Sequence, residues 1–116
     1  MGDYRKLRVW KDAVDFAVAC YEATSRFPSA ERFGLTSQMR RSAASIAANL
    51  AEGSGRKSDR EFARFTRIAG GSANETETFL ILAGRLGYLP DETAAQLCAA
   101  IGSIKRQLAG LERTLR

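Results

Sequence analysis

The chain has 116 residues, a formal net charge of +5 and a hydrophobic fraction of 45%. This length suits one domain, 1–116, in which folding buries about two thirds of the surface that the unfolded chain exposes. The sequence contains no histidine and only two cysteines, so it lacks the commonest catalytic base, the commonest zinc ligand and any disulfide framework. The composition therefore indicates a globular protein that folds without metal or disulfide, and it excludes enzymes that depend on histidine.

The N-terminal residues 1–12 carry charges where a secretory signal would be apolar. No window of the sequence is long and apolar enough to span a membrane. We therefore expect a cytoplasmic protein.

Apolar residues at intervals of three and four predict the first two helices. The first is predicted over 9–26 and ends at Phe27-Pro28, because proline disfavours a helical conformation in the residue before it. The second is predicted to begin at Thr36 as N-cap and to end at 53–55, since glycine readily adopts the left-handed conformation of a helix end. Their predicted buried residues are Trp10, Ala13, Val14, Ala17, Cys20, Tyr21 and Thr24, followed by Met39, Ala43, Ile46 and Leu50.

The third helix is predicted to open at Ser58, which has capping-box spacing to Glu61, and to end at Gly87. The pair Gly70-Gly71 inside it costs roughly 2 kcal/mol of helix propensity relative to alanines, and we expect close approach of a neighbouring helix as the reason. A fourth helix follows Pro90, which suits a first turn. The predicted ladders are Phe62, Phe65, Ala69, Ser72, Thr76, Phe79, Ala83 and Leu86, then Leu97, Ile101, Ile104, Leu108, Leu111 and Leu115.

The short links between these helices favour antiparallel neighbours. The fold class predicted from the sequence is all-α, an antiparallel up-down four-helix bundle. The ladder of the fourth helix has the spacing of a bundle or coiled-coil seam.

No residue set with catalytic spacing is present. The serines have no imidazole partner, and Glu75 and Glu77 are two residues apart, so a helix points their carboxylates in different directions. The glycine-rich segment 53–58 lacks the spacing of a phosphate-binding P-loop. We therefore expect no enzyme activity, no cofactor and no metal.

Basic residues are concentrated in the middle of the chain. Segment 36–70 holds seven basic residues against three acidic ones, whereas 71–100 holds one against four. Arginines on one helix face suit a phosphate backbone, although solvated faces paired with neighbouring carboxylates give the same pattern. On the first interpretation these side chains form one continuous positive surface that binds nucleic acid. The predicted contact residues are Arg40, Arg41, Arg56, Lys57, Arg60, Arg64 and Arg67.

Several aromatic side chains lie near helix ends or off the predicted buried stripes, Phe16 among them. They make more aromatic surface than one small bundle easily hides, which favours an oligomer interface. The predicted interface residues are Trp10, Phe27, Phe33 and Tyr88. Phe62 and Phe65, in contrast, fit the core ladder better than a base-stacking role.

Six segments together resemble a known family. They are LRVWK (7–11), FP (27–28), ERFGLTSQMRRSA (31–43), SI (45–46), NLAEG (49–53) and GSANE (71–75). In this order they resemble the bacterial four-helix-bundle proteins encoded in 23S rRNA intervening sequences, over nearly the whole chain. The accessory variability determinant of diversity-generating retroelements looks like the same fold.

The resemblance implies a cytosolic, basic homopentamer with no catalytic activity. In the retroelement relative, the pentamer is a nucleic-acid-binding partner of a reverse transcriptase. Two positions depart from the family pattern. Ala47 stands where proline is frequent, which predicts a straighter second helix, and Gly70 stands where a basic residue is common, which removes one potential phosphate contact.

We therefore expect a non-enzymatic oligomeric adaptor that binds structured RNA or DNA through a basic helical surface. The alternative is a protein-interaction scaffold that holds a partner enzyme and contacts nucleic acid only incidentally. In that case exposed aromatic residues such as Phe33 or Tyr88, rather than arginines, control its function.

Overall fold

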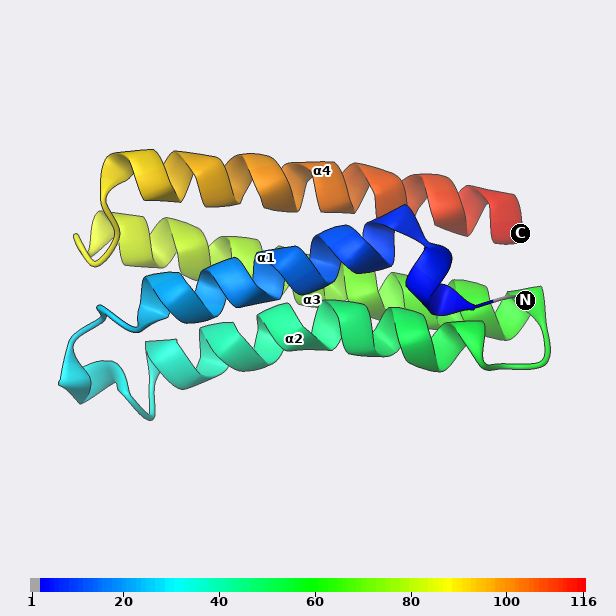
Figure 1. The fold of residues 1–116 in the computed structure, drawn as a ribbon, viewed down its shortest axis with the longest axis horizontal. Coiled ribbons are helices and arrows are strands. Elements are labelled where there is room, and N and C mark those ends of the chain that lie inside the picture. Colours follow the sequence, from blue (N-terminus) through cyan, green and yellow to red (C-terminus); the bar gives the residue numbers. More distant parts are fainter. Residues whose placement is uncertain (1–2) are drawn as a thin grey trace.

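The computed structural model describes residues 3–116, so the first two residues of the predicted domain 1–116 lie outside it. Within this range four long helices run up and down beside one another (Figure 1). They are α1 (Arg8–Thr24), α2 (Leu35–Ser54), α3 (Asp59–Arg85) and α4 (Asp91–Leu115), with the short 3-10 helices η1 (Tyr4–Lys6) and η2 (Ser29–Glu31). The predicted all-α, antiparallel up-down four-helix bundle is confirmed.

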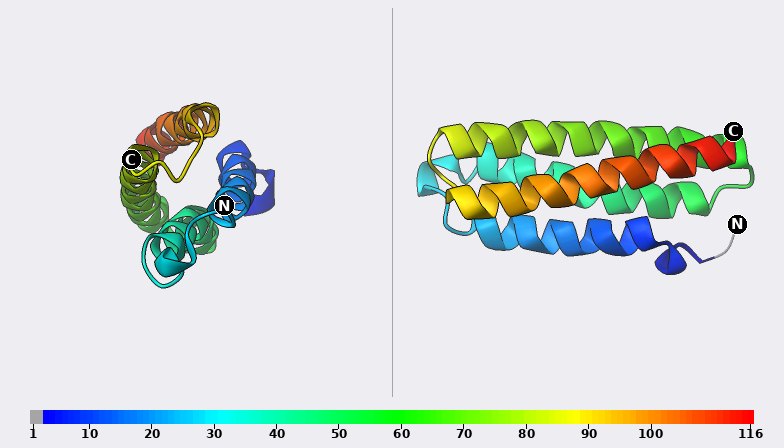
Figure 2. Two further views of the ribbon diagram at one scale, coloured as in Figure 1. Left: turned by 90° about the vertical axis from the view of Figure 1, so that its left-hand side faces the viewer. Right: turned by 90° about the horizontal axis from the view of Figure 1, so that it is seen from above.

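Helices that follow each other in the chain are neighbours in the bundle. The α2–α3 pair has the most extensive contact and the α1–α4 pair the least, and the end-on view in Figure 2 shows the wider spacing of α1 and α4. A hollow of about 340 Å³, lined in part by Phe16, Ala19 and Leu97, lies between them. No helix in the described part of the chain combines the length and the hydropathy that a membrane span requires.

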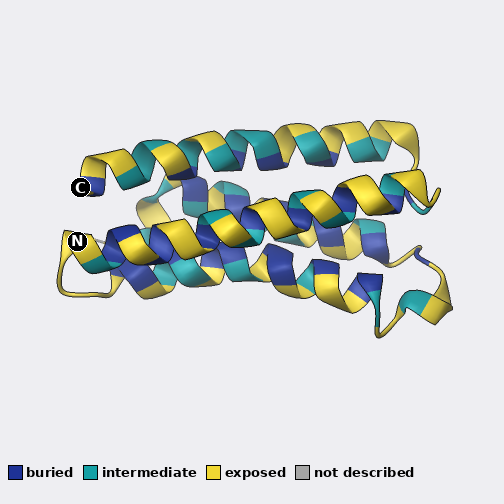
Figure 3. Cartoon of the chain, turned by 180° about the vertical axis from the view of Figure 1, so that it is seen from behind, coloured by how far each residue is buried: buried dark blue, intermediate teal, exposed yellow. Residues whose placement is uncertain are grey.

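The predicted core is confirmed in α2 and α4, where the whole ladder is buried except for half-buried Leu111 (Figure 3). In α1 the buried stripe is rotated, so that Val9 and Phe16 are buried and Tyr21 is 47% exposed. Phe16 is therefore a core residue that the sequence assignment missed. Trp10, Val14 and Ala17 are half-buried at the edge of this stripe.

The α3 ladder drifts along the helix. Ala73 and Leu80 are fully buried, whereas Leu86, predicted to be buried, is 49% exposed. A straight α-helix has 3.6 residues per turn, so a ladder with seven-residue spacing rotates by about 20° per heptad away from a fixed neighbour. The drift accumulates over the 27 residues of α3, and the prediction fails at the far end.

The helix ends divide into predicted and unpredicted ones. Ser58 caps α3 by accepting a hydrogen bond from the Glu61 backbone N–H at 3.1 Å. Gly87 has φ 78°, and the Tyr88 N–H donates to the Ala83 carbonyl at 3.0 Å, as in a Schellman motif. At the start of α2, Glu31 Oε1 accepts from the Leu35 N–H at 3.1 Å, so the prediction of Thr36 as N-cap is wrong.

Glycines in α2 and α3 act differently from the prediction. Gly53 lies inside α2, where an added Cβ would be 2.6 Å from the Phe65 Cβ. Gly55, the C-cap, has φ −84° and is not left-handed. At Gly70 and Gly71 an added Cβ would meet no described atom within 4 Å. The close helix approach that was predicted at the Gly70-Gly71 pair therefore occurs at Gly53 instead.

These two environments predict opposite effects of the same substitution. We expect Gly53→Ala to lower the free energy of unfolding by roughly 1–3 kcal/mol, because the new methyl group overlaps Phe65. Gly71→Ala, the matched control, should raise it by about 1 kcal/mol through helix propensity. Urea denaturation followed by circular dichroism measures both. A Gly53→Ala protein as stable as the parent would contradict the tight α2–α3 contact.

Candidate nucleic-acid interface

The seven predicted contact residues do not form one continuous surface. Arg40 and Arg41 lie in the first half of α2, whereas Arg56 lies just beyond its end. The part of α2 from Arg41 to its last residue, Ser54, is about 20 Å long. The exposed positions between Arg41 and Arg56 are Ala44, Ala48, Glu52 and Gly55, so uncharged and acidic residues interrupt the positive surface.

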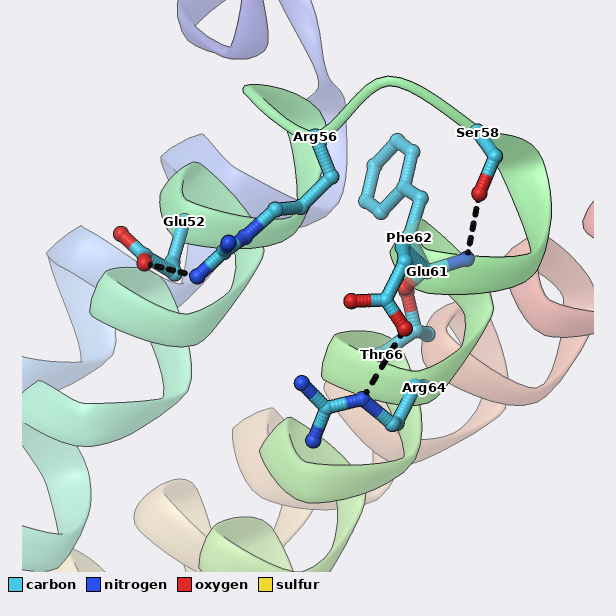
Figure 4. Close-up of polar contacts among 7 residues, drawn as sticks. All are labelled: Glu52, Arg56, Ser58, Glu61, Phe62, Arg64 and Thr66. Carbon is cyan, nitrogen blue, oxygen red and sulfur yellow. Dashed lines mark hydrogen bonds and ion pairs between the residues drawn. The ribbon is translucent and has the colours of Figure 1, made fainter.

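One group of basic residues lies at and after the link between α2 and α3, and Figure 4 shows two of them, Arg56 and Arg64. We call it the basic turn, and it consists of Arg56, Lys57, Arg60 and Arg64. The guanidinium groups of Arg56 and Arg64 lie 4.9 and 4.6 Å from the centroid of the Phe65 ring. Phe65 is only 9% exposed and Phe62 only 1%, so their predicted core role is confirmed.

Carboxylates partly neutralise the basic turn. Arg56 Nη2 lies 2.6 Å from Glu52 Oε1, and Arg64 Nε lies 3.2 Å from Glu61 Oε2 (Figure 4). Lys57 and Arg60 are exposed and form no ion pair with the described residues. Surface ion pairs are worth about 0–1 kcal/mol, so a phosphate can compete for the paired arginines.

Arg67 points away from this group. Its Nη1 lies 3.3 Å from Glu112 Oε2 on α4, so the side chain bridges two helices. Its predicted place with Arg60 and Arg64 on one binding face is therefore not supported by its contacts.

Arg40 is engaged at the C-terminus of α1. Its Nε donates to Thr24 Oγ1 at 2.7 Å and its Nη2 donates to the Tyr21 carbonyl at 3.2 Å. The same guanidinium lies 4.8 Å from the centroid of the Tyr21 ring. The last turn of α1 has no basic residue of its own, and Arg40 supplies the cation that the negative end of the helix favours. Arg40 is thus a structural residue first, which the sequence did not predict.

A shallow hollow beside Arg40 collects further cationic and aromatic side chains. We call it the α1–α2 hollow; its volume is about 420 Å³. No acidic residue among those that the structure describes lines it. The lining residues are Tyr21, Arg32, Phe33, Thr36, Ser37, Arg40 and Arg41.

Two residues of this hollow were missed as contact residues. Tyr21 was assigned to the core stripe, and Arg32 lies just outside the basic segment 36–70. The break at Phe27-Pro28 is the sequence signal that could have found Arg32, because it forces the link before α2 onto the surface. Phe33, which was predicted to lie in an oligomer interface, is 86% exposed, and its ring centroid lies 5.0 Å from the Arg32 guanidinium.

The other aromatic residues predicted for the oligomer interface are less exposed than Phe33 and therefore less able to contact another subunit. Phe27 is buried in the chain's own core, so the expectation that it is left for another subunit is wrong, as it is for Phe16. Trp10 is half-buried, with its ring centroid 5.2 Å from that of Tyr4. Tyr88 is half-buried, and its ring centroid lies 5.4 Å from that of Phe27. Its hydroxyl donates to Glu31 Oε2 at 3.0 Å, which raises the pKa of Tyr88.

The cysteines and acidic residues offer little chemistry. Burial raises the pKa of Cys20 to about 12, which keeps this thiol protonated at neutral pH. Cys98 is half-buried. Within residues 3–116, cysteine and acidic side chains do not gather in a group of three or more that could hold a metal ion.

These features define a small all-helical bundle with separate clusters of arginines on its surface. The model of the 23S rRNA-intervening sequence protein family matches residues 5–110, so the chain belongs to this family. This confirms the resemblance seen in the sequence.

Among solved structures, the chain is similar to a protein with unknown function from the S23 ribosomal protein family of Bacteroides thetaiotaomicron. The two share 28% sequence identity with a TM-score of 0.79, and the match covers 88% of this chain and 95% of the other. Comparison with curated proteins gave no match.

Arg40 and Arg41 are adjacent but differ in their contacts, so their alanine variants should differ in stability. We expect Arg40→Ala to lower the free energy of unfolding by about 1–2 kcal/mol, because it removes two charged hydrogen bonds at the end of α1. Arg41→Ala, the control, should change it by less than about 0.5 kcal/mol, since Arg41 is exposed. Urea denaturation of both variants gives the comparison, and equal effects would show that the Arg40 contacts contribute nothing.

Proposed function

We propose that this protein is a non-enzymatic, oligomeric adaptor of the cytoplasm that binds RNA or DNA through its phosphates. The observation that carries the proposal is the α1–α2 hollow, where Arg32, Arg40 and Arg41 come together without an acidic residue among the described lining. Because nearby carboxylates would compete with phosphate, this hollow is a better anion site than the basic turn.

The chemistry of guanidinium groups suits this role. Arginine keeps its charge at all physiological pH values and presents several N–H donors in a plane, which match the oxygens of a phosphate. Arg40 uses its Nε and one Nη2 hydrogen on α1, so further donors of the same group stay available for an anion. The net charge of +5 adds long-range attraction to any polyanion.

The basic turn is a second contact for the same polymer. Arg56 follows Gly55, the C-cap of α2, so it lies just beyond the end of the helix that carries Arg41. The part of α2 from Arg41 to its last residue, Ser54, is about 20 Å long, which is the length of about six base pairs of duplex at 3.4 Å for each phosphate of one strand. One extended nucleic acid along α2 therefore reaches both groups, with Lys57 and Arg60 as the unpaired cations at the far end.

The oligomeric part of the proposal is supported by exposed apolar residues on α3. Ile81, Leu82 and Leu86 are 51%, 45% and 49% exposed, and they lie within two turns near the end of the helix. Clustered apolar side chains of this kind favour contact with another subunit. The resemblance to the intervening-sequence proteins implies five subunits, and repetition of the anion site in such a ring strengthens binding to a polymer.

A partner-protein scaffold is the second candidate function. The apolar hollow between α1 and α4, with Phe16, Ala19 and Leu97 in its lining, favours it. Affinity capture with and without nuclease separates the two functions, because a partner held through nucleic acid is released on nuclease treatment whereas a directly bound partner is retained.

The proposed phosphate contacts predict a strong dependence of affinity on salt. A fluorescent RNA hairpin should bind more weakly as salt rises, with a linear fall of log K against log salt concentration. For the variant that combines Arg32→Glu with Arg41→Glu, the slope of this line should be smaller in magnitude by about 0.7–0.9 for each phosphate that the variant no longer binds.

The control Lys11→Glu with Arg106→Glu changes the net charge equally but at exposed positions outside the hollow and outside the apolar cluster of α3. If the control lowers the slope as much as the hollow variant does, the hollow has no special role. If the parent protein does not bind at low salt, the proposed function is wrong.

The oligomer proposal predicts a change in mass on one substitution. Leu82→Glu places a charge in the exposed apolar cluster and should reduce the molar mass measured by light scattering on a sizing column. Thr114→Glu adds the same charge at an exposed position of α4, at the opposite end of the bundle, and should leave the mass unchanged. An oligomer that survives Leu82→Glu would exclude this face as its interface.

A further inference from the structure

Phe33 is an apolar ring in a strongly cationic setting. It is 86% exposed at the link between η2 and α2, the largest exposure among the large hydrophobic side chains of the described residues. The exposed apolar residues near the end of α3 have apolar neighbours, whereas Phe33 has Arg32 beside its ring and shares the α1–α2 hollow with Arg40 and Arg41. Contact with an apolar protein surface would bury these charges at a high cost.

Tyr21 is a second ring in the same hollow, and it is held in place. It is 47% exposed, and the Arg40 guanidinium lies over it at 4.8 Å while also hydrogen-bonding the Tyr21 carbonyl. Because Arg40 is fixed by Thr24 as well, the ring, the cation and the end of α1 form one rigid unit. A ligand that stacks on Tyr21 therefore meets a surface that is already ordered.

The charged groups around the hollow also favour an anionic ligand. Glu31 is close in sequence, but its two carboxylate oxygens are bonded to the Leu35 N–H and the Tyr88 hydroxyl. Glu22 and Arg26 are exposed near the end of α1 and offset each other in charge. The N-terminus of α2 at Leu35 adds the positive end of a 20-residue helix dipole.

We propose that the α1–α2 hollow binds unpaired nucleotides, with bases stacked on Phe33 and Tyr21 and phosphates held by Arg32 and Arg41. This inference rests on the proposed function and names its ligand class. A duplex keeps its bases stacked inside and offers these rings nothing but its backbone, whereas single strands, loops and bulges present their base faces. Arginine stacked beside an aromatic ring is a typical arrangement in sites for single-stranded nucleic acid.

The experiment compares one single-stranded oligonucleotide with a duplex of the same length, both fluorescently labelled, on the full chain at fixed salt. We expect the parent to prefer the single strand. Phe33→Ala should weaken binding of the single strand by roughly 5- to 100-fold and change duplex binding by less than about 2-fold, because backbone contacts remain. Phe33→Trp, which keeps a stacking ring, should restore the preference.

The outcomes separate this inference from the proposed function. If the parent binds both ligands equally and Phe33→Ala has no effect, the stacking site is wrong while nucleic-acid binding stands. Absence of binding to either ligand overturns both proposals. If Phe33→Ala instead lowers the oligomer mass without changing affinity, Phe33 is a subunit contact and the inference is overturned. An unchanged thermal midpoint shows that the variant is folded.

Discussion

The close contact between α2 and α3 positions every other element of the bundle. Gly53 lets the two backbones approach where a methyl group would overlap Phe65, and further along the pair Thr76 Oγ1 donates to Ser42 Oγ at 2.8 Å in the core. Ser45 and Ser72 are hydrogen-bonded one turn away. Small and polar residues thus replace large apolar ones at these positions of the seam, and their hydrogen bonds add polar links between the two helices to the apolar packing. With this pair fixed, α1 packs on α2 and α4 packs on α3, which leaves α1 and α4 less closely joined.

Arg40 connects this framework to the candidate site. It lies on α2, yet its guanidinium satisfies the end of α1 and lies over one face of the Tyr21 ring, which stays 47% exposed. By these contacts Arg40 joins α1 to α2 at the end of the bundle that also carries Phe33. Structure and function therefore share one side chain: Arg40 positions the aromatic surface, while Arg32 and Arg41 remain at the rim with few constraints of their own. The basic turn at the opposite end is built differently, because Arg56 and Arg64 lie on the buried Phe65 ring and are paired with exposed carboxylates.

The features that the sequence predicted correctly depend on near neighbours in the chain. The ladder of α4, the Ser58 cap and the left-handed Gly87 follow from spacing and from the conformational preferences of single residues. Most of the failures depend on partners that are distant in sequence; the cap that Glu31 gives to the Leu35 N–H is the local exception. Nothing near Arg40 in the chain indicates that Thr24 will bind it. The different roles of Gly53 and Gly70 are decided by which residues of another helix lie opposite them. Glu31 takes the capping role that was predicted for Thr36. Phe16 is buried and Tyr21 is exposed, the reverse of the prediction, because a rotation of α1 by a fraction of a turn decides which residue faces the core.

Nucleic acid is proposed to bind at the end of the bundle that Arg40 organises. Ultraviolet cross-linking of the full chain to a short uridine-rich RNA, followed by tryptic digestion and mass spectrometry, locates the bound strand residue by residue. We expect nucleotide adducts on the peptides 12–26 and 33–40, which carry Tyr21 and Phe33. Adducts confined to the peptide 86–105, which carries Tyr88, or to the peptides around the basic turn would show that the strand binds elsewhere.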